Sequence, residues 1–281
     1  MSTLLDGQTP SSRRSGGRPR VVDADADGRF RELARALSLD PAARFVGGYV
    51  DWEWGHVRHV FDGLVEPVRG RAVLEIGCNL GATAIVLAAL GADVTAVDPN
   101  VRYLELAQAN AARHGVAGRI TFLHVTDSTH LPFDRGRFDW VSCNSVLEYV
   151  PPEVLPGVLR ELDRVLRPGG IAAVVGTSNR LWPRENHSRR WFVNYLPRWV
   201  DRLSGRRWAR GVGVWQIRRE LHAYDDLTRA RGGRLYVALK ARMGVRGRKL
   251  LVLDAASRVL GALGISPGAL APTTSLVLRK R

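Results

Sequence analysis

The sequence contains only two cysteines and three lysines, and it has no long apolar run. Cys78 and Cys143 have no CxxC partner and no neighbouring histidine cluster, which argues against a zinc site and a disulfide framework. A reducing, cytoplasmic environment is therefore expected. The best apolar stretch, 82–90, is about half the length of a bilayer-spanning helix, and the first twenty residues lack the apolar core of a signal peptide. We expect neither a membrane span nor a signal peptide.

Charge is distributed unevenly along the chain. The 281 residues include 42 Lys or Arg and 27 Asp or Glu, which gives a formal net charge of +15. Residues 1–179 hold 19 basic and 21 acidic residues, whereas residues 180–281 hold 23 basic and 6 acidic ones. Residues 180–220 also hold five of the eight tryptophans. The positive excess therefore belongs to the last third of the chain and not to the molecule as a whole.

Strand-like and helix-like segments alternate from residue 72 onward. Strands are predicted at 72–76, 94–97, 120–125, 138–143 and 171–177, and helices at 81–90, 101–113 and 153–166. Glycines, and the "RPGG" after the third of these helices, end the helices or turn the chain. Strands alternating with helices of this length predict a parallel sheet with helices on both faces.

Four segments are expected along the chain. Residues 1–28 lack periodicity and are predicted to be a disordered N-terminal tail. Residues 29–179 are expected to form the core of the α/β domain, with N-terminal helices near 30–39 and 50–65. Residues 180–220 are expected to form a basic lid or insertion, and residues 221–281 to complete the same α/β domain. In this last part we predict helices at 221–230 and 249–264 and strands at 234–240 and 273–280, with the apolar face of 249–264 packed on the sheet.

The stretch "VLEIGCNLGA" has the pattern of a strand, a glycine turn and the start of a helix. A dinucleotide fingerprint read from Gly77 needs two further glycines, so that backbone amides can approach a pyrophosphate. Asn79 and Ala82 occupy those positions, and no Gly-Lys-Ser/Thr follows to make a P-loop. What remains is Glu75, Gly77 and Gly81. An acid at the strand tip would repel a pyrophosphate and suits a cationic cofactor without phosphate.

Two more acids follow the next two predicted strands. Asp98 comes 21 residues after Gly77, where an acid accepts hydrogen bonds from ribose hydroxyls in nucleotide-binding α/β proteins. Asp127 follows the third strand and could accept a hydrogen bond from an adenine amino group. Because the carboxyl ends of parallel strands line one crevice, these acids together predict a site for S-adenosylmethionine or a close relative.

With these residues the chain resembles the class I S-adenosylmethionine-dependent methyltransferases, and among them the methyltransferase type 11 and ubiquinone-pathway O-methyltransferases. The resemblance runs from about residue 73 to residue 175. It rests on "VLEIGCNLGA", "VDPN", "VTDSTHLPF", "FDWVSCNSVLEYVP" and "LRELDRVLRPGG" in this order. It implies a Rossmann-like α/β fold of seven strands in the order 3-2-1-4-5-7-6, the last strand antiparallel and supplied by "TTSLVLRK".

The resemblance also implies the cofactor, S-adenosyl-L-methionine, and the residues around it. Glu75, Gly77 and Gly81 would surround its methionine part, Asp98 its ribose and Asp127 its adenine. The middle glycine usual in the family is replaced by Asn79. The full set predicted to bind the cofactor is Glu75, Gly77, Cys78, Asn79, Gly81, Asp98, Pro99, Asp127, Ser128 and Asn144.

Methyl transfer from a sulfonium requires that the acceptor be positioned and, for some acceptors, deprotonated. Many relatives carry Leu-Glu-His after the fourth strand, but this chain has Tyr149 in place of the histidine, and a tyrosine with its ordinary pKa is a poor base at neutral pH. His187 is the predicted catalytic residue, because "NRLWPRENHSRRW" resembles the lid of ubiquinone-pathway and sugar-modifying O-methyltransferases. A surface histidine on a basic loop is the alternative interpretation. His130 is expected to be structural, and no metal site is predicted.

The segment "YVDWEWGH" precedes the first strand. Tyr49, Trp52 or Trp54 could stack on the cofactor or the acceptor, since N-terminal helices close over the cofactor in this family. Burial in the core is the favoured interpretation, because aromatic side chains before a core are more often simply buried.

The predicted function is methyl transfer, by O-methylation, to a small-molecule, glycan or lipid-linked acceptor reached through residues 180–220. Tryptophan interleaved with arginine in this segment also fits an anionic membrane surface, hence a cytoplasmic protein peripheral to the inner membrane face. Nucleic acid fits the charge as well, but the fourth strand ends in "NSVL" and not in the Asn/Asp-Pro-Pro-aromatic motif of base-amino methyltransferases. The alternatives are an RNA methyltransferase and a non-catalytic membrane- or nucleic-acid-binding protein with a vestigial cofactor site.

Overall fold

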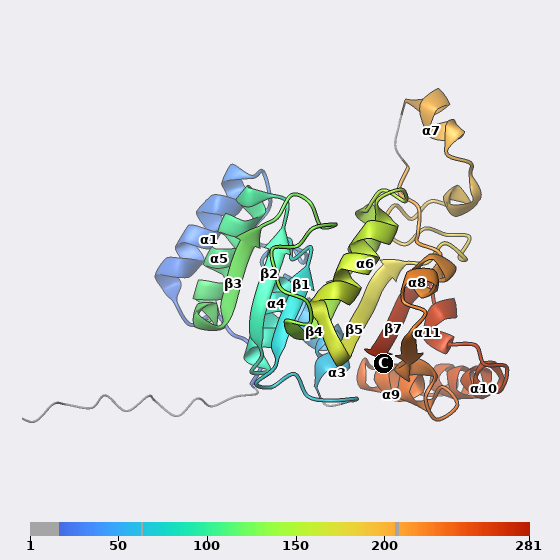
Figure 1. Cartoon of the computed structure of the whole chain (residues 1–281). Coiled ribbons are helices and arrows are strands. Elements are labelled where there is room, and N and C mark those ends of the chain that lie inside the picture. Colours follow the sequence, from blue (N-terminus) through green and yellow to red (C-terminus); the bar gives the residue numbers. More distant parts are fainter. Residues whose placement is uncertain (1–16, 63, 206–207) are drawn as a thin grey trace, which may run out of the picture.

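A computed structural model describes residues 17–62, 64–205 and 208–281 (Figure 1). Seven strands form one sheet in the order β3-β2-β1-β4-β5-β7-β6. The strands are β1 (Ala72–Ile76), β2 (Asp93–Asp98), β3 (Ile120–His124), β4 (Phe138–Asn144), β5 (Leu166–Ser178), β6 (Tyr224–Asp226) and β7 (Thr273–Lys280). The first five strands pair in parallel, and β7 is antiparallel to both β5 and β6. The predicted strand order and the antiparallel seventh strand are confirmed.

Helices cover both faces of this sheet (Figure 1). The helices of the described residues are α1 (Ala24–Ala36), α2 (Tyr49–His56), α3 (Arg58–Phe61), α4 (Ala82–Ala89), α5 (Val101–Arg113), α6 (Leu155–Val165), α7 (Trp199–Ser204), α8 (Val214–Glu220), α9 (Arg234–Arg242), α10 (Arg248–Ala262) and α11 (Pro267–Leu270). Side chains alternate along each strand, so Val73 joins the apolar cluster that includes α2 to α5 and α9, whereas Leu74 joins the cluster that includes α6 and α8.

Helix α1 begins inside the segment predicted to be disordered. Asp23 accepts a hydrogen bond from the Ala26 amide as the N-cap, and further acids lie in the first turn, where they interact favourably with the helix dipole. Phe30 and Ala34 pack in a cluster with residues of α5. Residues 24–28 are therefore helical, and residues 1–16 of the predicted tail lie outside the described residues.

Two predictions in the last part of the chain are wrong. Residues 221–230, predicted as a helix, contain the short strand β6, which ends where the Asp226 side chain accepts hydrogen bonds from the amides of Thr228 and Arg229. Residues 234–240, predicted as a strand, lie in helix α9, where Tyr236 and Leu239 are buried on one face. These two positions are three apart, so the apolar pattern of "RLYVALK" satisfies a helix as well as a strand.

The predicted helix at 249–264 is present as α10, but its contacts are mainly with α9 and α11 rather than with the sheet. The basic, tryptophan-rich segment lies between β5 and β6, as predicted, and contains α7 and α8. Figure 1 shows α7 standing away from the sheet. Within the described ranges, no helix is both long enough and apolar enough to cross a membrane.

Candidate functional site

The turn after β1 adopts a backbone conformation that few residues tolerate. Gly77, Asn79 and Gly81 have φ angles of +71°, +49° and +75°. A Cβ atom at Gly77 would lie 2.8 Å from the Val146 side chain, which only glycine avoids. Asparagine is one of the few other residues that enter the left-handed region readily. Asn79 therefore preserves the turn at the position where the family usually has its middle glycine.

Asp98 connects this turn to the end of β2. One carboxylate oxygen accepts a hydrogen bond from the Asn79 amide at 2.8 Å, and the other accepts from the Asn100 amide at 2.9 Å. The side chain is almost fully buried, yet it lines a cavity. Since an ionised carboxylate offers about four acceptor positions, Asp98 retains acceptor capacity for a ligand in that cavity.

A cavity of about 380 Å³ lies at the carboxyl ends of the parallel strands, within the range of about 300–1,000 Å³ that is usual for small-molecule sites. Six of the ten predicted cofactor residues line it, namely Gly77, Asn79, Asp98, Pro99, Asp127 and Ser128. Its other wall is largely apolar and was not predicted; it includes Tyr103, Val146, Tyr149, Val150, Val154 and Val158. The cavity thus has acids on one side and an apolar wall on the other.

The remaining four predicted residues do not line the cavity. Cys78 is buried in the apolar core, and burial raises the pKa of its thiol well above the usual range. Gly81 is the N-cap of α4, and the Asn144 amide donates a hydrogen bond to the Thr83 hydroxyl at 3.0 Å. Glu75 lies near the end of β1, with a side chain that is 3% exposed.

Two buried acids lie close together behind the turn. Oε2 of Glu75 is buried and has no hydrogen-bond partner among the described residues. Burial raises the pKa of Glu75 well above its usual value, and the nearby charges of Glu53 and Asp98 raise it further. Burial likewise raises the pKa of Glu53 to about 7, although hydrogen bonds to Tyr49 and Asn144 oppose the shift. A cation bound beside these acids would favour their ionised forms.

Glu53 was not among the predicted site residues, because only the aromatic residues of "YVDWEWGH" were expected to approach the cofactor or the acceptor. Trp54 is buried in the core, as the favoured interpretation expects, and Trp52 stacks on His56 with ring centroids 3.7 Å apart. Neither tryptophan lines the cavity. The available signal was an acid directly before a core tryptophan. A helix that turns an acid toward its buried face usually needs a polar partner for that acid, so such an acid indicates a polar site within the core.

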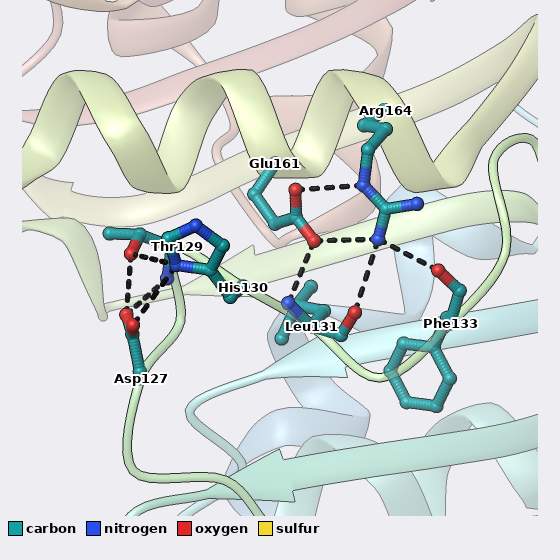
Figure 2. A network of polar contacts seen from close by, with 7 residues as sticks. All are labelled: Asp127, Thr129, His130, Leu131, Phe133, Glu161 and Arg164. Carbon is teal, nitrogen blue, oxygen red and sulfur yellow. Dashed lines mark hydrogen bonds and ion pairs between the residues drawn. The ribbon is translucent and has the colours of Figure 1, made fainter.

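The loop after β3 is fixed to helix α6 by a polar network (Figure 2). Glu161 accepts a hydrogen bond from the Leu131 amide at 2.7 Å, and Arg164 donates to the carbonyl oxygens of Leu131 and Phe133 at 3.1 and 2.7 Å. Nearer the cavity, the Thr129 amide and hydroxyl donate to Asp127 and hold the pKa of its carboxyl below the usual value. The network therefore holds the loop that carries Asp127 at the cavity edge.

His130 belongs to the same loop. Its Nδ1 lies 3.1 Å from Oδ2 of Asp127 and 3.0 Å from the Thr129 hydroxyl (Figure 2). The ring is not among the groups that line the cavity. These contacts are internal to the loop after β3 and do not bring His130 into the cavity wall.

His187 lies beside the cavity without lining it. Its Nε2 is 2.6 Å from Oε1 of Glu148, and its ring centroid is 5.7 Å from that of Tyr149, which does line the cavity. The Glu148 side chain is 2% exposed and that of His187 is 29% exposed. The hydrogen bond to Glu148 raises the pKa of His187 and outweighs the effect of burial. Glu148, which the sequence reasoning did not select, thus pairs with a histidine supplied by the lid.

Comparison with known proteins agrees with this geometry. Residues 73–170 match a family model described as a methyltransferase domain. The chain is 29% identical over 195 residues to the ubiquinone biosynthesis O-methyltransferase of Pectobacterium atrosepticum. The alignment covers 63% of this chain and 72% of that protein. The chain is also 29% identical over 153 residues to the protein of the same name from Escherichia coli O9:H4, covering 48% of this chain and 62% of that protein.

A solved structure with the same fold is a putative sarcosine dimethylglycine methyltransferase from Galdieria sulphuraria. It has 14% sequence identity to this chain and a TM-score of 0.50, and the match covers 91% of this chain and 98% of the other. The family match, the relatives and the sheet order agree with one another. The chain belongs to the class I S-adenosylmethionine-dependent methyltransferases and is an enzyme of that kind.

Proposed function

We propose that this enzyme transfers the methyl group of S-adenosylmethionine to a hydroxyl oxygen of a small-molecule, glycan or lipid-linked acceptor. The observation that carries this proposal is the pair of His187 and Glu148, 2.6 Å apart, next to Tyr149 in the cavity wall. A hydroxyl acceptor must lose a proton as it is methylated, and a histidine held by a buried carboxylate is suited to accept it.

The residues around the cavity suit this cofactor. S-adenosylmethionine carries positive charge on its amino and sulfonium groups and has no phosphate; when bound, it supplies an electrophilic methyl group. Oε2 of Glu75, which is buried and has no hydrogen-bond partner in the described part of the chain, is the group that the amino group would satisfy, and Asp98 would accept from the ribose hydroxyls. Asp127 and Ser128, on the loop fixed to α6, would lie beside the adenine.

The two partners in the His187–Glu148 pair have different roles. Nε2 of His187 is engaged by Glu148, so Nδ1 is the ring nitrogen that would accept the acceptor's proton. Glu148 would hold the ring in place and stabilise the imidazolium ion that forms, as a carboxylate does for histidine in hydrolase triads. Because one partner follows β4 and the other belongs to the lid, the base is complete only when the lid is docked.

The exposed aromatic side chains of the lid favour an apolar or lipid-linked acceptor. Trp191, Phe192, Tyr195 and Trp199 are each more than half exposed, and Trp191, Phe192 and Tyr195 form a continuous row of ring contacts. Exposed aromatic rings among arginines are suited to the boundary between an anionic membrane and water. A cytoplasmic location at the inner membrane face, with residues 180–220 against the lipid, is part of this proposal.

Transfer of labelled methyl groups from S-adenosylmethionine to three acceptor classes tests the proposal. The acceptors are a catechol with an isoprenoid tail, an alkyl glycoside and a short RNA. We expect label on the catechol or glycoside, and a loss of kcat of about 100-fold or more in His187→Gln, with the cofactor-induced thermal shift retained. His130→Gln is the matched control and should keep its activity. Labelling of the RNA alone, or full activity of His187→Gln, would refute this assignment.

A further inference from the structure

Helix α10 turns an apolar face to the solvent. Leu251, Val252, Val259 and Leu263, the residue that ends the helix, are 62–70% exposed, and Ala255, Ala256 and Ala262 are exposed beside them. At 100° per residue these seven positions fall on one stripe, and none of them is charged. Soluble proteins seldom expose a contiguous apolar surface of this kind unless it contacts a partner.

The orientation of α10 is fixed by close backbone contacts on its other side. A Cβ atom at Gly261 would lie 2.8 Å from the backbone of Gly232, and one at Gly233 would lie 2.9 Å from the Ser257 carbonyl oxygen. Ser257 is the buried residue of the helix. Rotating the helix to bury its apolar stripe would break this packing, so the stripe faces outward as a result of how α10 is docked.

The surroundings of the stripe are strongly basic. Residues 227–265 contain nine Lys or Arg and one acid, Asp254, and that acid is already paired with Arg258 at 2.6 Å. Arg246, Arg248 and Lys249, at the start of the helix, are exposed. The helix therefore combines an apolar outer stripe with a net positive charge around it.

We propose that α10 is a membrane-docking helix that lies flat on a bilayer containing anionic phospholipid. Leu251, Val252, Val259 and Leu263 enter the boundary between headgroups and acyl chains, and the flanking arginines and lysine meet the phosphates. The positive charge and the apolar stripe together distinguish between the possible partners. A second copy of this chain would bring two basic surfaces together, and a nucleic acid would leave the apolar stripe uncovered. An anionic lipid surface satisfies both features.

This surface is separate from the lid, because α7 and α10 lie at opposite ends of the same edge of the molecule in Figure 1. Lipid contact by α10 requires neither methyl transfer nor His187. The sequence pattern predicted that this helix packs on the sheet.

Vesicle flotation of the full chain tests this proposal. The vesicles contain phosphatidylcholine alone or mixed with phosphatidylglycerol, and flotation is measured over a salt series. We expect binding to the mixed vesicles only, weakening as salt increases. The triple substitution of Val252, Val259 and Leu263 by serine should reduce partitioning about 100-fold, since each apolar side chain contributes a factor of several. These positions are exposed, so the cofactor-induced thermal shift should be unchanged. The triple substitution should cause a similar further loss of flotation in a lid variant, Trp199→Ser, because the two surfaces are separate; no further loss in that background would overturn the proposal.

A fluorescent label gives a second, independent measurement. Cys78 and Cys143 are buried, so Val259→Cys can be labelled selectively with an environment-sensitive dye. We expect a blue shift when mixed vesicles are added, and none for the same dye on Ala36→Cys, at the exposed end of α1. Wild-type flotation by the triple variant, equal binding to neutral vesicles, or bound protein without a dye shift would overturn the proposal. A shift that depends on protein concentration without vesicles would instead show self-association through this face and would overturn it too.

Discussion

Replacing Glu53 by glutamine should change how the stability of the protein depends on pH. Glu53 is 5% exposed, and burial raises its pKa from 4.5 to about 7. The folded protein therefore binds a proton at Glu53 more tightly than the unfolded chain does. The stabilisation that protonated Glu53 gives the fold is complete below the pKa of Glu53 in the unfolded chain. It is lost as the pH rises through the pKa of Glu53 in the folded protein. Between about pH 5 and about pH 8 this loss amounts to roughly 2–3 kcal/mol of unfolding free energy.

Glu53→Gln keeps the volume of the side chain and an acceptor oxygen for Tyr49, but it does not titrate. Urea unfolding at several pH values should therefore show wild type losing stability relative to Glu53→Gln as the pH rises. The difference between the two proteins cancels other titrating groups, and Glu105→Gln, an exposed acid on α5, should show no such trend. A stability difference that is constant from about pH 5 to about pH 8 would refute the assignment of a raised pKa to Glu53.

The same substitution should affect the cofactor. Because the charge of Glu53 helps to raise the pKa of Glu75, removing that charge should leave Glu75 more fully ionised at neutral pH. A cationic ligand would then be bound more tightly, and the thermal shift produced by S-adenosylmethionine should increase in Glu53→Gln. A smaller shift, with the fold intact, would contradict the view that Glu75 faces the positive end of the cofactor.

Three further substitutions, the second with a matched control, test the packing of the site and of the core. Gly77→Ala forces a Cβ atom to within 2.8 Å of Val146 at a positive φ and should lower stability by about 1–3 kcal/mol and reduce the cofactor-induced thermal shift; an unchanged shift would show that the turn is not part of the site. Arg113→Met removes a guanidinium that is 4% exposed and 2.9 Å from Asp27. The free energy of unfolding in urea should fall by about 3 kcal/mol or more. The control Arg31→Met, at a half-exposed arginine that also pairs with Asp27, should lower it by less than about 1 kcal/mol. Trp140→Ala opens a cavity in the middle of the sheet and should lower stability by about 3–5 kcal/mol; a cost below about 1 kcal/mol would mean that the core refills the space.

The central part of the fold was predictable because several local signals agree there. Glycine turns end the elements around β1 and β2, and an acid lies in or just after each of β1, β2 and β3, namely Glu75, Asp98 and Asp127. The last sixty residues lack that agreement. "RLYVALK" fits two periodicities equally, and its helical form is decided by the burial of Tyr236 and Leu239 against distant elements.

The cavity residues were predictable where they belong to the loops after β1, β2 and β3. Their function depends on position within a single short motif, which the sequence displays directly. Glu148 and His187 are 39 residues apart in the sequence. Glu53 lies close enough to Glu75 for its charge to act on it, but it belongs to a separate helix. Such contacts depend on how the lid and α2 dock on the sheet, which the order of residues does not display.

The hydrogen bonds of the turn after β1 also bear on redesign of this enzyme. The Gly77 and Cys78 amides both donate to the Val97 carbonyl oxygen, and the Gly81 amide donates to the Cys78 carbonyl oxygen. The Asn79 amide donates to Asp98. A pyrophosphate needs backbone amides that are free to donate. Restoring the fingerprint glycine with Asn79→Gly would therefore not convert this loop into a dinucleotide-binding loop, because the amides themselves are already engaged within the protein.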